Sequence, residues 1–308
     1  MNKVDLSIVV PVHNNARSIE ELVYRINSTA NKLNLSHEVI LVDDGSKDQS
    51  WKAIQKAKSS YDREVVGVRL EKNVGQHNAI ICGLNYSHGA LVVTMDADLQ
   101  HPPEEIEKLI LKHRESESDV VYGIYKTRKH GFLRSAGSVV VQKSSKYFAD
   151  HKGGVGSSFR LFTRSLVDKI KNHSQNFIYI DEIIHWYTGD INLVPVEHHE
   201  RKVGKSSYSF YKLVKLYIAI LVNFTAWPLK IITFIGFASS ILSFLIGVRF
   251  ILKKLFFNVG VPGFTALIVT ITFSASLILL SLGIIGQYIY KIYHQQNGKP
   301  PYAINRVI

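Results

Sequence analysis

Three short polar clusters each follow a run of apolar residues that is typical of a buried strand. They lie at residues 11–15 (Pro-Val-His-Asn-Asn), 43–46 (Asp-Asp-Gly-Ser) and 96–100 (Asp-Ala-Asp-Leu-Gln). Because ligands bind at the edge of an α/β sheet where parallel strands end, we expect the three clusters to form one site. Alternate side chains of an extended backbone lie on one side, so Asp96 and Asp98 can together ligate a hard cation, Mg²⁺ or Mn²⁺, that holds substrate phosphates.

Two of the clusters also have a simpler interpretation. A lone Asp-x-Asp often arises by chance on solvated turns, and residues 43–46 are compatible with an Asx turn that caps the next helix. Alternatively, the Asp44 carboxylate accepts a hydrogen bond from the ring N–H of a nucleobase. The occurrence of all three clusters at strand ends favours a nucleotide site. The chain contains neither Gly-x-Gly-x-x-Gly nor Gly-x-x-x-x-Gly-Lys-Ser/Thr, which argues against a dinucleotide enzyme or a P-loop ATPase.

The residues between these clusters alternate between strand and helix patterns. Short β-rich runs predict strands at residues 6–10, 38–42, 65–70, 91–95 and 120–122, and helical patterns lie at 18–33, 49–60, 77–86 and 103–115. Strands that alternate with helices are typical of an α/β domain with a mainly parallel sheet. This arrangement places the polar clusters at one edge of that sheet.

The composition limits the classes of fold and partner. The chain has 308 residues, of which 46% are hydrophobic, and its formal net charge of +12 favours anionic partners such as nucleic acid, anionic lipid or phosphorylated small molecules. The single cysteine, Cys82, excludes an intramolecular disulfide framework and a multi-cysteine zinc site. The sequence contains no nucleic-acid recognition module, so no nucleic acid is expected as a partner. Residues 1–6 lack the features of a signal peptide, which predicts a cytosolic location for this half.

The last quarter of the chain is more apolar than the rest. Residues 231–248 and 255–290 carry no charge, and each can supply the roughly 20 apolar residues that cross a bilayer. With the turn Gly-x-Pro-Gly between them, they predict a two-helix transmembrane hairpin; the alternative is a buried hairpin in a soluble domain. Apolar residues at helical spacing over 210–224 predict an amphipathic helix in the headgroup region, or else a helix that packs on the preceding domain.

Together these motifs resemble those of the inverting family 2 glycosyltransferases. The resemblance runs from about residue 5 to residue 290. It rests on the three clusters, on Asn-Val-Gly-Gln-His at 73–77, on the two prolines that follow residues 96–101, and on His-Glu-Arg-Lys-Val-Gly-Lys-Ser at 199–206. The polyprenyl-phosphate branch is most similar; it includes dolichol-phosphate mannose synthase and the undecaprenyl-phosphate formamido-arabinose transferases.

The resemblance implies a GT-A-like nucleotide-sugar-binding domain with a mainly parallel sheet at residues 1–206. An amphipathic interface helix at 207–229 and a transmembrane hairpin at 230–290 (helices at about 231–251 and 264–290) would follow, and 291–308 would be a cytosolic tail. It also implies a multi-pass protein of the inner (cytoplasmic) membrane, with a cytosolic catalytic domain, contacts to membrane lipids, and a homo-oligomeric state, a tetramer in relatives.

The same resemblance assigns donor-site roles to residues of the matching motifs. Asp96 and Asp98 are expected to hold the donor phosphates through Mg²⁺ or Mn²⁺, and Asp98 is also expected to be catalytic. The other residues expected at the donor are Pro11, His13, Asn15, Val42, Asp44, Asn73, Ala97, Gln100, Arg201 and Lys205.

Three positions depart from the family pattern. The motif after the first proline commonly ends in glutamate, which weakens any role of Asn15. The lysine of Arg-x-x-Gly-x-Ser-Lys is displaced to Lys205. Ser158 stands where many relatives have an aspartate, so no catalytic role of that aspartate carries over to this chain.

A basic loop follows the last predicted strand, at residues 126–130. Guanidinium groups match phosphate oxygens, so Arg128 and Arg134 are candidate catalytic residues that hold a lipid phosphate. The alternative is a solvated or headgroup-binding loop. Asp181 and Glu182 are interpreted either as contacts to the donor sugar or, more simply, as surface acids.

The expected function is the metal-assisted transfer of a sugar, with inversion, from a nucleotide sugar to the phosphate of a polyprenyl phosphate, here undecaprenyl phosphate, in cell-envelope glycan modification. The resemblance favours uridine as the base. A processive polysaccharide synthase is one alternative, but that group usually carries Gln-x-x-Arg-Trp and more spans, and this sequence has neither. A catalytically inactive membrane scaffold with a sugar-nucleotide fold is another, and the intact Asp-Ala-Asp at residues 96–98 argues against it.

Overall fold

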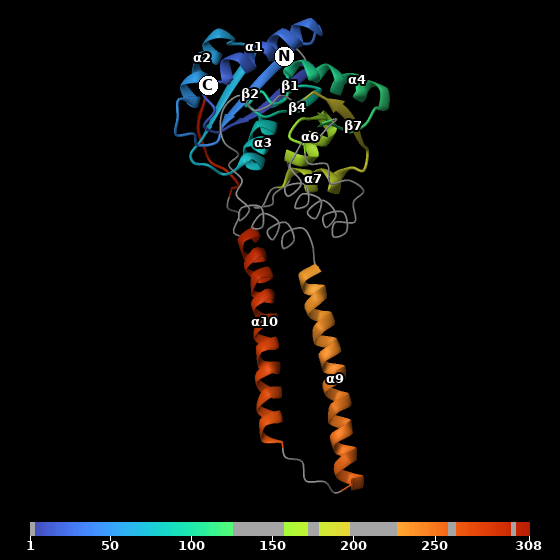
Figure 1. The fold of residues 1–308 in the computed structure, drawn as a ribbon. Helices are drawn as coiled ribbons and strands as arrows, with labels where there is room; N and C mark the ends of the chain where they lie inside the picture. Colours follow the sequence, from blue (N-terminus) through green and yellow to red (C-terminus); the bar gives the residue numbers. More distant parts are fainter. Residues whose placement is uncertain (1–3, 126–156, 172–178, 198–226, 258–262, 297–299) are drawn as a thin grey trace. The chain divides into compact units, whose positions relative to one another are not determined.

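The computed structural model describes residues 4–125, 157–171, 179–197, 227–257, 263–296 and 300–308. These residues belong to two compact units. The first contains the described residues up to 197 together with 300–308, and the second contains 227–257 and 263–296. The chain therefore leaves the first unit, forms the second, and rejoins the first at its C-terminal end (Figure 1).

The first unit is built on an eight-stranded sheet in the order β7-β5-β6-β4-β1-β2-β3-β8. The pairs β1–β2, β1–β4, β2–β3 and β5–β7 are parallel, whereas β6 is antiparallel to β4 and β5, and β8 is antiparallel to β3. The sheet is thus mixed but mostly parallel. Its strands are β1 (Leu6–Val12), β2 (His37–Asp43), β3 (Val65–Leu70), β4 (Leu91–Thr94), β5 (Val120–Tyr125), β6 (Arg160–Thr163), β7 (Ile191–Val196) and β8 (Ile304–Val307).

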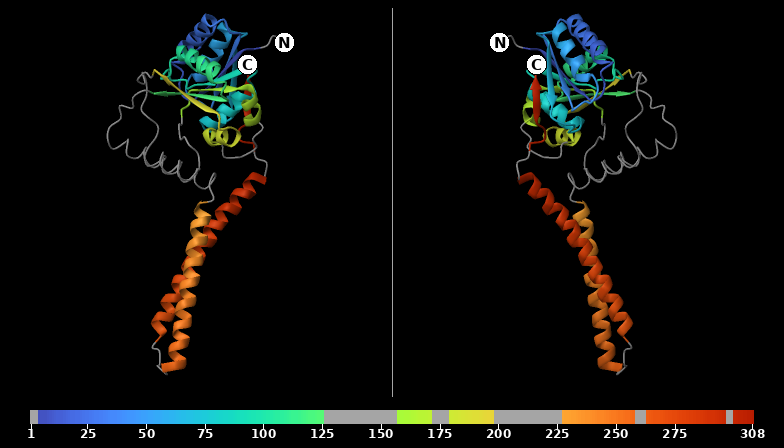
Figure 2. Two further views of the ribbon diagram at one scale, coloured as in Figure 1. Left: turned by 90° about the vertical axis from the view of Figure 1, so that its right-hand side faces the viewer. Right: turned by 90° about the vertical axis from the view of Figure 1, so that its left-hand side faces the viewer.

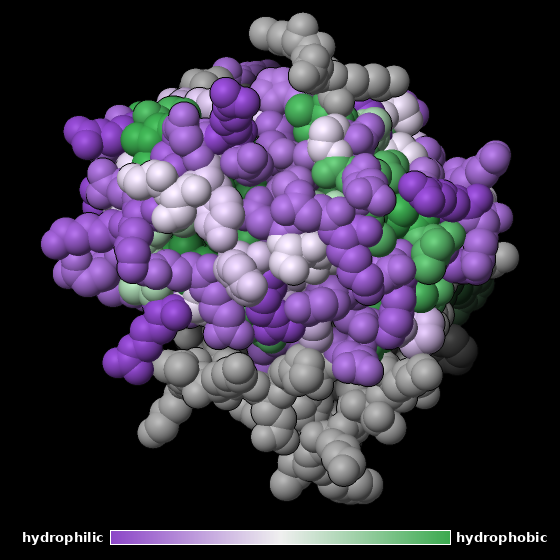
Figure 3. All heavy atoms as spheres, turned by 90° about the horizontal axis from the view of Figure 1, so that it is seen from above, coloured by the Kyte–Doolittle hydropathy of each residue, from purple (hydrophilic) through white to green (hydrophobic). Residues whose placement is uncertain are grey.

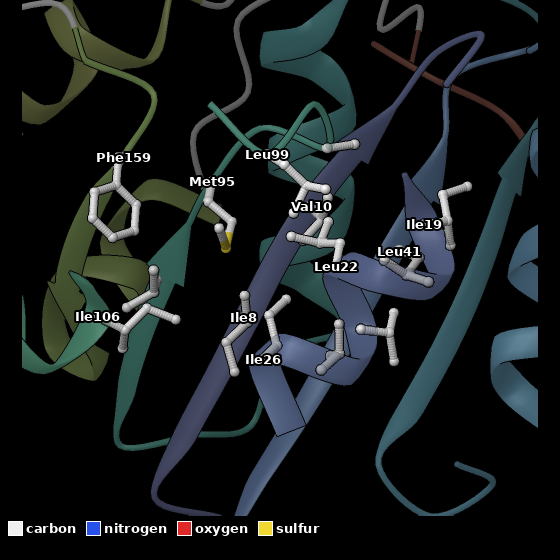
Figure 4. Packing of buried hydrophobic residues seen from close by; sticks show 14 of the residues in the cluster. Ile8, Val10, Ile19, Leu22, Ile26, Leu41, Met95, Leu99, Ile106 and Phe159 are labelled. Atoms are coloured by element: carbon white, nitrogen blue, oxygen red, sulfur yellow. The ribbon is translucent and has the colours of Figure 1, made fainter. Parts of the chain in front are cut away.

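Three helices pack on one face of this sheet (Figures 1 and 2). They are α1 (Ile19–Lys32), α2 (Ser50–Ser60) and α4 (Ile106–Ser116), the last preceded by the 3-10 turn η1 (Pro103–Glu105). Leu22 and Ile26, one helical turn apart on α1, are buried in one cluster with Ile8 and Val10, which alternate along β1 (Figure 4). The periods of helix and strand therefore bring two apolar rows together, and this burial stabilises the unit.

The opposite face carries α3 (Gln76–Asn85), α6 (Arg164–Lys171) and α7 (Ile180–Tyr187). Val9 of β1 and Ile40 of β2 point to this face and pack with the apolar residues of α3. Gly83 allows the helix to approach β1, because a Cβ atom at this position would lie 2.3 Å from Val9 Cγ1. The start of α3 is consequently held close to the ends of β1 and β2.

The structure confirms the predicted α/β fold and its mostly parallel sheet. The five predicted strands correspond to β1 to β5, and the four predicted helices correspond to α1 to α4. The sequence did not predict β6, β7 or β8. Strands β6 and β8 have only four residues each, and β7 contains Pro195, which a sheet tolerates because β7 is an edge strand.

The C-terminal residues form a strand of the sheet, so their description as a tail at 291–308 is wrong for residues 304–307. Beyond β8, Ile308 and Gly67 exchange backbone hydrogen bonds of 2.9 and 3.0 Å. The hydroxyl of Tyr302 accepts a hydrogen bond of 3.0 Å from the Asn85 side chain of α3. The C-terminal end of the chain is therefore held on the first unit at residues 302–308.

The second unit contains the long helices α9 (Trp227–Phe257) and α10 (Phe264–Gln296). Among the described residues, one stretch is long and apolar enough to cross a membrane: Phe273–Tyr290 of α10, with a mean hydropathy of 1.6 and no buried residue. Phe234 and Phe237 of α9 are also exposed, whereas the face of the first unit in Figure 3 is largely hydrophilic. The two-span hairpin stays a prediction, and most of the amphipathic helix predicted at 207–229 lies outside the described residues.

Candidate active site

The ends of β1, β2 and β4 lie at one edge of the sheet, as the sequence predicts. Pro11 and Val42 are paired in the register of β1 with β2. Ser18, just before α1, donates a hydrogen bond from its hydroxyl to the carbonyl of Ala97, beyond β4. The polar clusters that follow these three strands therefore form one continuous site.

Asp44 is bonded mainly by the loop that begins α3. Its Oδ1 accepts a hydrogen bond of 2.7 Å from the backbone N–H of Val74, and its Oδ2 accepts bonds of 3.0 Å from the Gly75 N–H and the Asn73 side chain. Burial raises the pKa of Asp44, and the two backbone hydrogen bonds oppose that rise. A carboxylate offers about four acceptor positions, so Oδ1 retains one acceptor position.

The turn after β2 is capped by Asp43 rather than by Asp44. The backbone N–H of Ser46 donates to Asp43 Oδ1 at 3.0 Å. Asp43 is fully buried, and its Oδ2 lies 3.5 Å from Nε of Arg69 on β3. Because Asp43 caps the turn, the carboxylate of Asp44 faces the α3 loop.

His13 is fixed by its two ring nitrogens. Nδ1 lies 2.9 Å from the Asp44 carbonyl, and Nε2 lies 2.9 Å from the side-chain amide nitrogen of Asn14. The side-chain amide nitrogen of Asn73 also lies 3.1 Å from Nδ1, so both ring nitrogens are engaged by the protein. The exposed ring of His13 therefore offers its aromatic faces, and not its nitrogens, to a ligand.

Asp96 is bonded at both carboxylate oxygens. Gln76, the first residue of α3, donates from Nε2 to Asp96 Oδ1 at 2.6 Å, and Ser158 donates from its hydroxyl to Asp96 Oδ2 at 2.6 Å. These donors come from segments 20 residues before and 62 residues after Asp96. The long range of these contacts explains why the sequence did not indicate either of them.

Asp98 lies two residues further along the same segment. Its Oδ1 accepts a hydrogen bond of 3.2 Å from the backbone N–H of Gln100, across Leu99, whose φ of 59° marks a left-handed turn. Asp96 and Asp98 thus supply hard oxygen ligands, which fit Mg²⁺ or Mn²⁺. The described residues contain no group of three or more His, Cys, Asp or Glu side chains that could hold a metal. A cation at this site would therefore need further ligands, such as substrate phosphate oxygens.

A buried charged cluster lies on the α3 side of the sheet. Arg160, at the start of β6, forms an ion pair with Asp181 of α7 and lies 5.7 Å above the ring of Tyr122. The Tyr122 hydroxyl donates to Asp181 at 3.0 Å. Burial lowers the pKa of Arg160, but Asp181, Tyr122 and Tyr179 together outweigh this effect, so the pKa is raised overall. The interpretation of Asp181 as a surface acid is therefore wrong: it is a mostly buried partner of Arg160.

His77 connects this cluster to the site. Its Nδ1 accepts a hydrogen bond of 3.5 Å from the backbone N–H of Ile180, and its ring lies 4.8 Å from that of Tyr179. Burial lowers the pKa of His77 to about 4. A neutral imidazole therefore follows directly after Gln76 at neutral pH.

The structure brings most of the predicted donor residues to this edge. They are Pro11, His13, Asn15, Val42, Asp44, Asn73, Asp96, Ala97, Asp98 and Gln100. Arg128, Arg134, Arg201 and Lys205 lie outside the described residues. Residues that the prediction omitted are Gln76, His77, Ser158 and Arg160. Only the Gly-Gln-His run and the family motif around residue 158 gave any signal for them.

Known proteins are similar to this chain over nearly its whole length. The family model described as Glycosyl transferase family 2 matches residues 7–174. The undecaprenyl-phosphate 4-deoxy-4-formamido-L-arabinose transferase of Proteus mirabilis is 32% identical over 100% of this chain and 94% of its own length. The protein of the same name from Klebsiella pneumoniae subsp. pneumoniae is 31% identical over 98% of this chain and 93% of its own length.

Solved structures support the fold. Glucosyl-3-phosphoglycerate synthase from Mycobacterium tuberculosis, crystallised with Mn²⁺, UDP and glucosyl-3-phosphoglycerate, matches with a TM-score of 0.52 at 18% identity, over 71% of this chain and 78% of that chain. Its complex with Mn²⁺ and UDP-glucose also gives a TM-score of 0.52. This likeness shows a GT-A-like α/β fold. From the family match and the full-length relatives we conclude that the chain belongs to glycosyltransferase family 2 and is an enzyme of that family.

Proposed function

We propose that this glycosyltransferase moves a sugar from a nucleoside diphosphate sugar to the phosphate of undecaprenyl phosphate, with inversion at the anomeric carbon. The observation that carries the proposal is the identity of about 30% with undecaprenyl-phosphate 4-deoxy-4-formamido-L-arabinose transferases along nearly the whole of both chains. That likeness includes the long helices, which a soluble family member would not need. A polyprenyl acceptor is therefore favoured over a soluble one.

The two ends of the site suit the two ends of a nucleotide sugar. Asp44, with one acceptor position left, and the face of His13 suit a nucleobase. Asp96 and Asp98 suit the diphosphate through Mg²⁺ or Mn²⁺. The structural relative that binds UDP with Mn²⁺ supports uridine as the base and Mn²⁺ as one usable metal.

The acceptor phosphate is already anionic at neutral pH, so the transfer does not require a protein base. An acceptor oxygen forms the new bond to the anomeric carbon, while the bond from that carbon to the nucleoside diphosphate breaks and its electron pair stays on the diphosphate. A bound divalent cation would neutralise the charge that develops there. The chain's own contribution is to position donor and acceptor in line, with Asp96 and Asp98 on the donor side. Arg128 and Arg134 are proposed to hold the acceptor phosphate.

The membrane arrangement follows from the return of the chain to the first unit. Because β8 pairs with β3, the described residues up to 197 and residues 300–308 both belong to the first unit, for which we propose nucleotide binding. Two spans, one in each helix, leave both ends on one side of the membrane, whereas a single span does not. We therefore propose an inner-membrane protein with its catalytic unit in the cytosol, and a homo-oligomer as relatives imply.

Cysteine labelling tests this topology in a Cys82→Ser background. Asn258→Cys, between the two helices, is expected to react with an impermeant thiol reagent on intact cells. Asn305→Cys, on β8, is expected to react only after the cells are permeabilised. Equal protection of both positions would remove the two-span arrangement.

The proposed activity is tested with the full-length protein in detergent micelles that contain undecaprenyl phosphate. A panel of UDP-, dTDP- and GDP-sugars is supplied with Mg²⁺ or Mn²⁺, and the lipid-linked sugar is measured by mass spectrometry. Product from one donor, absent in EDTA, is the expected result. Release of free sugar without lipid product would indicate a hydrolase, and polymer formation would indicate a processive synthase.

A further inference from the structure

Both oxygens of the Asp96 carboxylate are bonded by neutral side chains from two distant segments. Gln76 Nε2 and Ser158 Oγ each lie 2.6 Å from one of the oxygens. Each contact fixes one oxygen of the carboxylate, so the two contacts together orient Asp96.

Ser158 is fixed to the strand that leads into Asp96. Its carbonyl accepts a hydrogen bond of 2.9 Å from the hydroxyl of Thr94, the last residue of β4. Two residues on, Arg160 of β6 is paired in register with the same Thr94. The backbone of Ser158 is therefore held beside Asp96 by the β4–β6 pairing.

Gln76 is fixed to the other end of the site. It follows Gly75, whose N–H donates to Asp44 and whose φ of 92° sets the direction of the chain into α3. Asn78, on the same helical turn, donates from its side chain to the Val74 carbonyl at 2.8 Å. The short segment at 73–76 thus bonds Asp44 through its backbone and Asp96 through Gln76.

We infer that Gln76 and Ser158 are positioning residues that set the affinity of the site for the divalent cation bound with the nucleotide. Side chains that bond a metal ligand commonly change metal affinity 10- to 100-fold when they are removed, because they fix the orientation of the ligand. This inference rests on the proposed function for the metal and extends it to two residues outside the carboxylate pair.

Binding of Mn²⁺ tests the inference separately from turnover. The full-length protein in detergent is titrated with Mn²⁺ at saturating UDP, and free Mn²⁺ is followed by electron paramagnetic resonance. Gln76→Ala and Ser158→Ala are each expected to weaken Mn²⁺ binding about tenfold, and the double variant further. Ser158→Thr keeps the hydroxyl and is expected to bind Mn²⁺ as the unchanged protein does.

A matched control separates positioning from folding. Asn78→Ala removes a side-chain amide from the same turn of α3, but this amide bonds the Val74 carbonyl and not Asp96. This variant is expected to lower the melting temperature and to leave Mn²⁺ affinity within about twofold. Gln76→Ala is expected to weaken Mn²⁺ binding and to leave the melting temperature nearly unchanged.

Two results would overturn the inference. In one, Gln76→Ala and Ser158→Ala bind Mn²⁺ as tightly as the unchanged protein. In the other, they lose Mn²⁺ affinity only in proportion to a loss of melting temperature, as Asn78→Ala would. If the unchanged protein bound no Mn²⁺ with UDP, both the proposed metal site and the positioning role of Gln76 and Ser158 would be wrong. If the Mn²⁺ shifts appeared but no lipid product formed with any donor, the positioning role would stand and the proposed acceptor would fall.

Discussion

Asp44 and Asp96 occupy equivalent places, each just past the end of a strand, but they are bonded in different ways. Asp44 accepts hydrogen bonds from the backbone N–H groups of Val74 and Gly75. Asp96 accepts its two described side-chain bonds from Gln76 and Ser158. Backbone donors at the start of a helix move only if that turn unfolds, whereas side chains change rotamer readily.

For the donor site that we propose, this difference indicates a rigid nucleoside end and an adjustable phosphate end. A nucleobase has one shape to recognise, so a prebuilt pocket loses little entropy on binding. Two phosphates and a cation enter and leave in each turnover, so carboxylates held by side chains can adapt to them.

The largest effect is expected at the phosphate end. Asp98→Asn keeps an Oδ1 acceptor for the Gln100 N–H but removes the charge that a cation needs. Transfer of sugar to lipid is expected to fall about a thousandfold, while the melting temperature is unchanged. The exposed Asp190→Asn is the control and should transfer sugar normally. Near-normal turnover of Asp98→Asn, or full activity in EDTA, would contradict the metal site.

The next effect concerns His77, which follows Gln76 on α3. Burial lowers its pKa from 6.5 to about 4, with the Asp181 carboxylate opposing that effect and Arg160 adding to it. Between pH 6.5 and pH 4 the unfolded chain binds a proton that the folded chain does not. Stability therefore falls as the pH falls through this window, by up to about 3 kcal/mol from this residue.

Comparison with a variant isolates this contribution. In His77→Gln, urea unfolding in detergent is expected to show a shallower loss of stability between pH 6.5 and pH 4. Above pH 7, the difference in unfolding free energy between the two proteins should not change with pH. Parallel curves over the whole range would mean that His77 titrates normally in the folded protein.

Much of this contrast could not be read from the sequence. The strand-end clusters were predictable because an apolar run followed by polar residues marks a strand end, and parallel strands end together. The bonds that distinguish Asp44 from Asp96 were not, because they join residues 20 to 62 positions apart. The pairing of Arg160 with Asp181 was hidden for the same reason, since no local pattern shows which face of α7 meets β6.

Short and edge strands limited the fold prediction in a similar way. Strand β8 has four residues at the end of a chain that has passed through two long apolar helices, and nothing local relates it to β3. The sequence predicts β3, the partner strand of β8, but nothing in it shows that the outer edge of β3 is covered. An unpaired edge of a predicted sheet is therefore worth matching against C-terminal segments.

A smaller effect is expected at the nucleoside end when Asp44 is removed. Asp44→Ala leaves the N–H groups of Val74 and Gly75 without their acceptor and should cost about 2 kcal/mol of unfolding free energy. Asp44→Asn retains one acceptor oxygen and should cost less. Urea unfolding measures both, and calorimetry with UDP should show weaker binding in each. An Asp44→Ala protein of normal stability would mean that this end is not rigid.

The smallest effect is expected at Gly75, where the two ends are joined. Its φ of 92° and ψ of 154° are accessible to glycine and strained for alanine, although a Cβ atom there would meet nothing within 4 Å. Gly75→Ala should therefore lower the unfolding free energy by about 1 kcal/mol through backbone strain alone, after the gain from a stiffer unfolded chain. Gly189→Ala is the matched control, because its Cβ also has open space and its φ is not in the left-handed region.

If the chain relaxes at Gly75, the hydrogen bonds to Asp44 should lengthen while the rest of the unit stays folded. The UDP affinity should then fall clearly, with little change in melting temperature. Equal stability of the two variants would show that the turn into α3 tolerates other conformations, and the rigid nucleoside end would lose its main support.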